Sequence, residues 1–190
     1  MIWRTFGIGL LTLLSVIARG ESDDLDELLH LLAMRQHGRV DFVEQHFLAL
    51  LKRPVESYGE LIYDAPNRLE KRTLEPRPES LLLEGNILTV RRGLHVHVLD
   101  LQAYPQILPF IESIRATLSG DRAALEGAFR VEYDGTLARW ALILVPREAQ
   151  VAKTVSQVRI DGSRATLFSV EILEADGDRS LMTLRERPAR

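Results

Sequence analysis

Two histidines, His95 and His97, have a spacing that fits a chemical role. Residues two apart on a β-strand point to the same face, so both imidazoles can reach one metal ion. A stable site needs a third or fourth ligand, and no neighbouring motif supplies one. We therefore interpret the two histidines as residues of a polar face, beside the inward-pointing Val96 and Val98, and we expect no metal site.

Nucleophilic chemistry also lacks the setting that it needs. Ser57, Ser80 and Ser169 are not placed in the strand–turn–helix elbow that exposes a catalytic serine. The chain has no cysteine, and no glycine-rich loop with the spacing of a phosphate-binding site. We therefore expect no enzymatic activity and no cofactor.

The first twenty residues predict the compartment. Arg4 is followed by an apolar run from Thr5 to Ala18, and acidic residues come directly afterwards. This run is shorter than the ~20 apolar residues that span a bilayer, so it fits the hydrophobic region of a signal peptide. Cleavage after Ala18 or after Gly20 fits the small-residue rule. We expect residues 1–20 to be removed and the protein to work in a bacterial periplasm; a buried helix or a retained anchor is the alternative.

Composition limits the partners and the number of domains. The sequence has 24 Lys and Arg residues against 27 Asp and Glu residues, a net charge of −3 with the signs interspersed. Such a chain is a poor candidate for phosphate-backbone binding, so nucleic acid is not an expected partner. The absence of cysteine excludes disulfides. Residues 21–190 fit a single domain with its own core, and we expect a monomer.

Apolar residues at helical spacing predict two helices. The first spans about residues 22–38 and has Leu28 and Leu32 on its apolar face. The second spans about residues 104–120, and a short helical turn follows near residues 122–125. The apolar stripe of the second helix contains Ile107, Phe110, Ile111 and Ile114.

The rest of the chain alternates apolar and polar residues between proline and glycine corners. This alternation predicts antiparallel strands with one wet face and one apolar face. We expect strands at about residues 39–51, 55–64, 68–74, 80–84, 86–91, 94–101, 129–134, 138–145, 155–161, 165–174 and 179–185. Because large sheets tend to curl, the fold class is mainly β, an antiparallel barrel of about 10–11 strands, open or closed, with helices plugging it.

The corners between Phe42 and Val90 carry a resemblance to a known family. They are Phe42-x-Glu44, Gly59-Glu60-Leu61-x-Tyr63, Pro66-x-Arg68-Leu69-Glu70 and Leu81-Leu82-Leu83-Glu84-Gly85, with a later match at Trp140-x-Leu142-x-Leu144-x-Pro146-Arg147. Their order resembles the periplasmic lipoprotein carriers of the LolA family, and more closely a divergent LolA-related subgroup. The resemblance implies an incomplete barrel around an apolar cavity, with helices as a lid.

The alternation and the resemblance together predict the site residues. The expected cavity residues are Phe47, Leu61, Tyr63, Leu69, Leu81, Leu83, Val96, Val98, Trp140, Leu142 and Leu144. The expected lid residues are Leu28, Leu32, Ile107, Phe110, Ile111 and Ile114. The alternative interpretation of the same stripes is an ordinary close-packed core.

The resemblance implies a carrier that binds the acyl chains of lipoproteins and shuttles them from an inner-membrane release complex to an outer-membrane acceptor. Ala65 stands where the main family has an arginine before the proline, and Lys71 stands where an aromatic residue is usual. In the main family that arginine participates in controlling lid opening. These departures leave open a dedicated carrier for another lipid or a polyene. The alternative class is an envelope sensor of lipoproteins or lipids that uses the same half-barrel.

Overall fold

The structure, a computed structural model, describes residues 21–104 and 108–186, so the expected signal peptide lies outside the described residues. The α-helices are α1 (Glu21–Ala33), α2 (Leu108–Ser119), α3 (Arg122–Ala128) and α4 (Ala149–Ala152), and η1 (Leu101–Ala103) is a 3-10 turn. The strands are β1 (His37–Phe47), β2 (Val55–Asp64), β3 (Arg68–Glu75), β4 (Glu79–Glu84), β5 (Ile87–Arg92), β6 (His95–Asp100), β7 (Phe129–Thr136), β8 (Arg139–Pro146), β9 (Val155–Ser163), β10 (Thr166–Glu174) and β11 (Arg179–Glu186).

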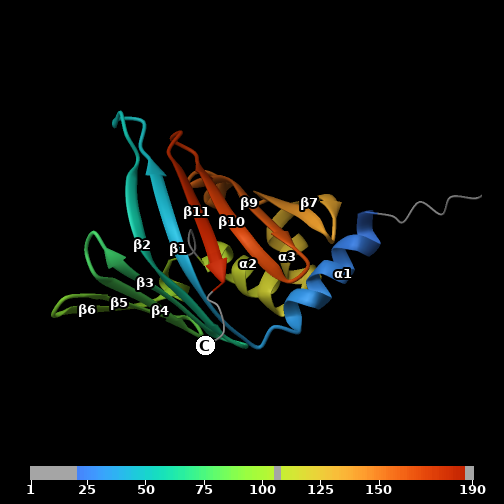
Figure 1. Cartoon of the computed structure of the whole chain (residues 1–190), viewed down its shortest axis with the longest axis horizontal. Coiled ribbons are helices and arrows are strands. Elements are labelled where there is room, and N and C mark those ends of the chain that lie inside the picture. The colour runs from blue at the N-terminus through green and yellow to red at the C-terminus, as the bar shows by residue number, and fades with distance from the viewer. Residues whose placement is uncertain (1–20, 105–107, 187–190) are drawn as a thin grey trace, which may run out of the picture.

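All of these strands belong to one antiparallel sheet, in the order β6-β5-β4-β3-β2-β1-β11-β10-β9-β8-β7. Strands β1 to β6 form one meander and β7 to β11 form a second, and the pairing of β1 with β11 joins them in the middle of the sheet (Figure 1). The edge strands β6 and β7 do not pair with each other. The sheet is therefore not closed, which confirms the predicted incomplete antiparallel architecture.

Most predicted strand boundaries agree with the structure, but β1 ends at Phe47 rather than near Leu51, α4 was not expected, and the first two helices differ as well. Helix α1 ends at Ala33 rather than near Gly38, because β1 begins at His37, where His37 pairs with Asp64 of β2. Helix α2 is described from Leu108, and the expected first turn at residues 105–107 lies outside the described residues. Among residues 21–104 and 108–186, no helix has the length and hydropathy to cross a bilayer.

The pairing register assigns each strand residue to one of two faces, because directly opposed residues point the same way. On the first meander, Tyr63 opposes Leu69, which in turn opposes Leu83. On the second, Leu142 opposes Ile160. We call the face with these residues the inner face, because buried residues of α1, α2 and α3 pack on it. The opposite face is the outer face.

The core lies between the helices and one half of the inner face. Four leucines of α1 are at most 4 % exposed and pack with buried residues of α2, α3 and β7 to β9. The buried cluster consists of Leu25, Leu28, Leu29, Leu32, Ala116, Leu125, Phe129, Trp140, Leu142, Leu144, Val158 and Ile160. Each large side chain buried in this way contributes ~1.5 to 3 kcal/mol to the stability of the fold. The helices are thus held on the half of the sheet formed by the second meander.

Two aromatic side chains of the inner face lie against a glycine on the next strand. Phe42 is opposed by Gly59, and Trp140 is opposed by Gly162. A Cβ atom on Gly59 would lie 2.8 Å from the Phe42 ring, and one on Gly162 would lie 2.3 Å from the Trp140 ring. Because glycine has no side chain, both rings can approach the neighbouring backbone.

We predict that Gly59→Ala lowers the free energy of unfolding by about 1 to 3 kcal/mol, as overpacking does elsewhere. The added Cβ would lie 1.9 Å from the carbonyl oxygen of Arg72, so backbone and ring must both shift. The matched control is Gly38→Ala on β1, where a Cβ meets nothing within 4 Å. Urea unfolding of both variants checks this, and equal losses would contradict it.

Candidate functional site

The apolar inner face continues beyond the helices onto β2, β3 and β4. Trp140 and Leu142, under the helices, are at most 2 % exposed, whereas Leu61, Leu69 and Leu81 are only half-buried. Helices α1 and α3 contact β7, and α2 packs on α1 and α3. The inner face therefore has a covered half on the second meander and an open half on the first, where Leu83 of β4 is the predicted cavity residue that is buried, at 4 % exposure. We use these two names below.

Most of the predicted cavity residues share the inner face. By the register they are Leu61, Tyr63, Leu69, Leu81, Leu83, Trp140, Leu142 and Leu144. Phe47 does not belong to this set, because it opposes Arg179, whose guanidinium lies 4.1 Å from the centroid of the Phe47 ring on the outer face. A shift of one residue along a strand moves a side chain to the other face, and Phe47 is one such position.

Val96 and Val98 also lie on the outer face, where they are 51 % and 63 % exposed. His97 opposes Val90 of the inner face, and His95 opposes Arg92. The orientation of β6 is therefore the reverse of the expected one, with the histidines on the inner side. Both histidines are exposed, and within the described part of the chain no group of three or more His, Cys, Asp or Glu residues could hold a metal ion.

The predicted lid residues fall into two groups. Leu28 and Leu32 of α1 are at most 2 % exposed and belong to the buried core cluster. Ile111 and Ile114 of α2 are half-buried, and neither is among the described residues of that cluster. Ile107 and the side chain of Phe110 lie outside the described residues. Helix α1 is thus part of the core, whereas α2 has apolar side chains that the core cluster does not bury.

A polar network lies between the two halves of the inner face. The Glu44 carboxylate is 7 % exposed and accepts a hydrogen bond from Lys71 Nζ at 2.5 Å. It also accepts hydrogen bonds from the hydroxyls of Ser57 and Ser180, at 3.2 and 3.1 Å. His46 Nε2 lies 3.1 Å from Glu44 Oε2. These residues come from β1, β2, β3 and β11, so the network joins the two meanders across the middle of the sheet.

The surroundings of Glu44 favour its ionised form. Burial alone would raise the pKa of the Glu44 carboxyl, but the charge and hydrogen bond of Lys71, helped by His46, outweigh it and hold the pKa below its ordinary value. Glu44 is therefore a carboxylate at neutral pH. The pair carries no net charge, which limits the cost of placing it on an apolar face.

Lys71 has hydrogen-bonding capacity that Glu44 does not use. An ammonium group has three N–H donors, and among the described residues Lys71 donates only to Glu44. Its side chain is 24 % exposed, and Nζ lies 5.1 Å from the centroid of the Phe42 ring. The remaining donors can reach an acceptor on a molecule that lies against the inner face.

The sequence itself contains a signal for this network. Glu44 follows Phe42 by two residues, and Lys71 follows Leu69 by two, so each charge sits at an apolar-face position of its strand. Opposite charges at inward positions of strands in one meander predict an ion pair. Lys71, which stands where the main family has an aromatic residue, is thus one partner of the ion pair with Glu44.

A second half-buried cation, Arg115, lies between α2 and the open half. Arg115 Nη1 donates to Asn86 Oδ1 at 3.2 Å, in the turn between β4 and β5. The Nε and Nη2 atoms of Arg115 are buried and have no hydrogen-bond partner among the described residues. Because an unpaired buried donor is costly, this arginine is better satisfied when an acceptor is present beneath α2.

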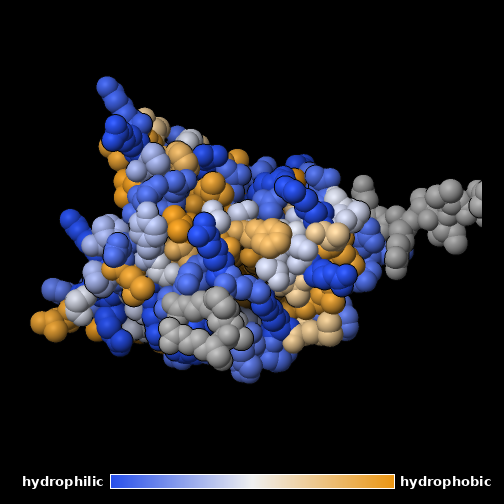
Figure 2. Space-filling model, viewed as in Figure 1, coloured by the Kyte–Doolittle hydropathy of each residue, from blue (hydrophilic) through white to orange (hydrophobic). Residues whose placement is uncertain are grey.

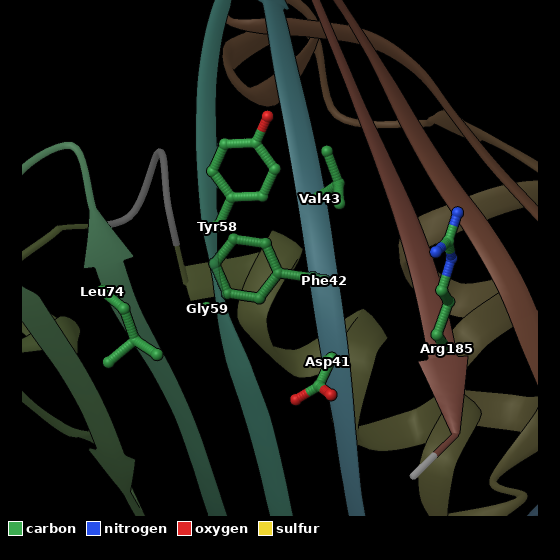
Figure 3. A pocket seen from close by; sticks show the side chains of 7 residues that line it. All are labelled: Asp41, Phe42, Val43, Tyr58, Gly59, Leu74 and Arg185. Carbon is green, nitrogen blue, oxygen red and sulfur yellow. The ribbon is translucent and has the colours of Figure 1, made fainter.

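A hollow of about 380 Å³ opens elsewhere, over β1, β2 and the end of β3 (Figure 3). Its lining consists of Asp41, Phe42, Val43, Tyr58, Gly59, Leu74 and Arg185. Asp41, Val43 and Tyr58 are outer-face residues by the register, and Tyr58 is 41 % exposed. This hollow therefore opens on the outer face, although Phe42 and Gly59 of the inner face also line it.

A comparison with protein families decides the identity. A family model described as outer membrane lipoprotein carrier protein LolA-like matches residues 17–187. The chain belongs to this LolA-like family. The family predicted from the corners of residues 42–90 is thereby confirmed. A comparison of this LolA-like protein with curated protein sequences gave no match.

Solved structures similar to this LolA-like protein share little sequence with it. A LolA superfamily protein from Nitrosomonas europaea is 10 % identical with a TM-score of 0.43, over 90 % of this chain and 94 % of that chain. The MucA/MucB complex of Pseudomonas aeruginosa is 12 % identical with a TM-score of 0.43, over 88 % of this chain and 59 % of that chain. The lipoprotein LppX of Mycobacterium tuberculosis is 9 % identical with a TM-score of 0.43, over 87 % of this chain and 97 % of that chain.

We predict that Glu44→Gln lowers the free energy of unfolding at pH 7 by about 1 to 3 kcal/mol, because Lys71 loses a charge-assisted hydrogen bond. The pKa of Glu44 is lower in the folded state, so this stabilisation is fully present above the unfolded pKa of about 4.3. It is lost as the pH falls through the folded value. The difference between parent and variant should therefore shrink below about pH 4.

Urea unfolding of both proteins at a series of pH values measures this difference. The double variant Glu44→Gln/Lys71→Met is the matched control, because it removes both charges and leaves no ammonium without its partner. We expect it to lose less stability than the sum of the two single variants. A gap between parent and Glu44→Gln that stays constant down to acidic pH would contradict the assignment.

Proposed function

We propose that this LolA-like protein is a carrier that holds the acyl chains of a lipoprotein or a related lipid against the open half of the inner face. The observation that carries the proposal is the apolar surface of Leu61, Leu69 and Leu81, which the core helices leave half-buried. Family membership supports the class of function. No covalent chemistry is involved.

The energetics favour acyl chains as cargo. Each methylene removed from water contributes ~0.8 kcal/mol, so ten methylenes contribute ~8 kcal/mol before the costs of ordering the chain. A sheet surface lined by leucines offers non-directional contacts, which suits flexible chains. The unused donors of Lys71 and Arg115 supply a polar complement, since the carbonyl or acidic oxygens of a lipid head can accept from them.

The proposed lid is α2. Its half-buried Ile111 and Ile114 are available to compete with acyl chains for the open half, whereas α1 stays in the core. Cargo would displace α2, and delivery would let it return. Competition of this kind lets one protein both bind and release a tightly held apolar ligand.

Transport requires a route and partners. We propose that the protein is exported, works in the periplasm as a monomer, and moves cargo from an inner-membrane release complex toward an outer-membrane acceptor. Lys71 in place of an aromatic residue favours a cargo with an acceptor group near its acyl chains.

The first test separates a ligand-holding surface from ordinary core. We predict that Leu81→Ala weakens binding of a fluorescent fatty acid at least several-fold while lowering the free energy of unfolding by less than about 2 kcal/mol, because Leu81 is half-buried. The matched variant is Leu142→Ala, at a position with 0 % exposure, which should cost about 2 to 5 kcal/mol.

Fluorescence titration and urea unfolding of both variants give the two readouts. If the parent protein does not bind the probe, the carrier proposal fails. It also fails if Leu81→Ala costs as much stability as Leu142→Ala and binding is unchanged, because Leu81 is then part of a closed core.

The second test addresses the lid. Hydrogen exchange of the backbone amides in α2 should become faster when an acylated peptide is bound, because cargo and α2 seek the same surface. Exchange in α1 should stay slow in both states, since its leucines remain in the core. Slower or unchanged exchange in α2 on loading would show that cargo does not displace this helix.

A further inference from the structure

Three turns of the first meander lie at the same end of its strands, and we call this end one edge of the sheet. They are residues 48–54 between β1 and β2, residues 76–78 between β3 and β4, and residues 93–94 between β5 and β6. Neighbouring strands in a sheet are about 4.8 Å apart, so successive turns on one edge are separated by about 10 Å. Figure 1 shows the three tips in a row, with the β1–β2 hairpin projecting farthest. We call these turns and the strand ends beside them the rim.

Large apolar side chains are exposed on the rim. Leu94 is 100 % exposed and Leu50 is 97 % exposed, and Leu51 and Leu74 are more than half exposed. Single exposed leucines are common on protein surfaces, but the fold does not account for two in the β1–β2 turn, one in the β5–β6 turn and one near the end of β3. Figure 2 shows hydrophobic and hydrophilic atoms next to each other at these tips.

The same rim has more cations than carboxylates, with Lys52, Arg53, Arg77, Arg91 and Arg92 against Glu56, Glu75 and Glu79, although the whole chain has a net charge of −3. Lys52, Arg53 and Arg77 lie in the turns, are exposed, and make no ion pair with another described residue. Arg91 is exposed as well, and Arg92 is paired with Glu79. Cations beside exposed leucines make the rim amphipathic.

Backbone hydrogen bonds hold the longest tip in a defined shape. The N–H of Ala49 donates to Asp178 Oδ1 at 2.8 Å, and the N–H of Leu51 donates to the carbonyl of Leu48 at 2.9 Å. The carboxylate of Asp178 thus accepts a hydrogen bond from the backbone of the tip, and it forms no ion pair with Lys52 or Arg53. The leucine at the apex, Leu50, is held outward by an ordered turn.

We propose that the rim docks the protein on an anionic phospholipid surface. Leucines that sit on separate tips suit a flat apolar layer, which can receive each one independently, better than they suit a single groove on a protein partner. Basic residues around them match the charge of anionic head groups, and each contributes about a fivefold gain in binding near such a surface. This docking is a surface property distinct from the inner-face site, and it would bring the open half close to the bilayer.

Vesicle co-sedimentation tests the proposal, with protein recovered after export so that parent and variants carry the same N-terminus, checked by intact mass. We use vesicles of phosphatidylcholine and vesicles that contain equal parts of phosphatidylcholine and phosphatidylglycerol. The parent should bind the anionic vesicles more strongly, and added salt should weaken that binding. Leu50→Ser/Leu51→Ser should reduce the partition coefficient at least tenfold, and Lys52→Gln/Arg53→Gln should remove most of the preference for the anionic vesicles.

The matched control is Ile87→Ser, a substitution of a 41 % exposed apolar residue at the opposite edge of the sheet, and it should bind vesicles as the parent does. All variants should keep parental unfolding midpoints and fatty-acid binding, which separates this surface from the carrier site. Absence of parental binding to anionic vesicles overturns the proposal. So does a leucine variant that binds like the parent, or an Ile87 variant that loses as much binding as the leucine variant.

Discussion

The sheet has more apolar surface on one face than its helices cover, and the rest of the structure depends on this excess. The leucines of α1 bury the half formed by β7 to β10, where Trp140 and Leu142 are almost fully enclosed. No comparable set of buried helix residues faces β2 to β4 in the described part of the chain. A folded protein with such an uncovered apolar surface gains by binding something apolar, and this is the physical basis of the carrier function proposed above.

The two faces of the sheet treat charge differently. On the outer face, Glu70 is buried by pairing with Arg68 and Arg72, whose long side chains cover it. On the inner face, Glu44 and Lys71 form a pair with an apolar surface on both sides. A buried pair of this kind adds little net stability compared with apolar residues, so its value lies in orientation: it keeps an ammonium group at a fixed place on a surface that otherwise has no directional contacts.

The local parts of the fold could be predicted from the sequence, because each strand carries its own alternation and each corner its own proline or glycine. It is harder to predict from the sequence which face of the sheet each side chain of a strand occupies. On β6, histidines and valines alternate and both are exposed, so no buried residue distinguishes the two faces, and Val96 and Val98 were predicted on the wrong one. Phe47 is the last residue of β1, and its ring points outward because it stacks against the guanidinium of Arg179. The Glu44–Lys71 pair joins residues that are 27 apart in sequence, which alternation alone does not connect.

The pairing of β1 with β11 has a consequence for how the sheet is assembled. These two strands lie side by side in its centre, yet they are the first and the last strands of the described chain. During synthesis, β1 to β6 can form local hairpins early, but one side of β1 stays unpaired until almost the whole described chain has emerged. Pairing over such a sequence separation is slow, and an open strand edge is prone to associate with other chains. The centre of the finished sheet is therefore the part of the nascent chain that most needs protection by a chaperone.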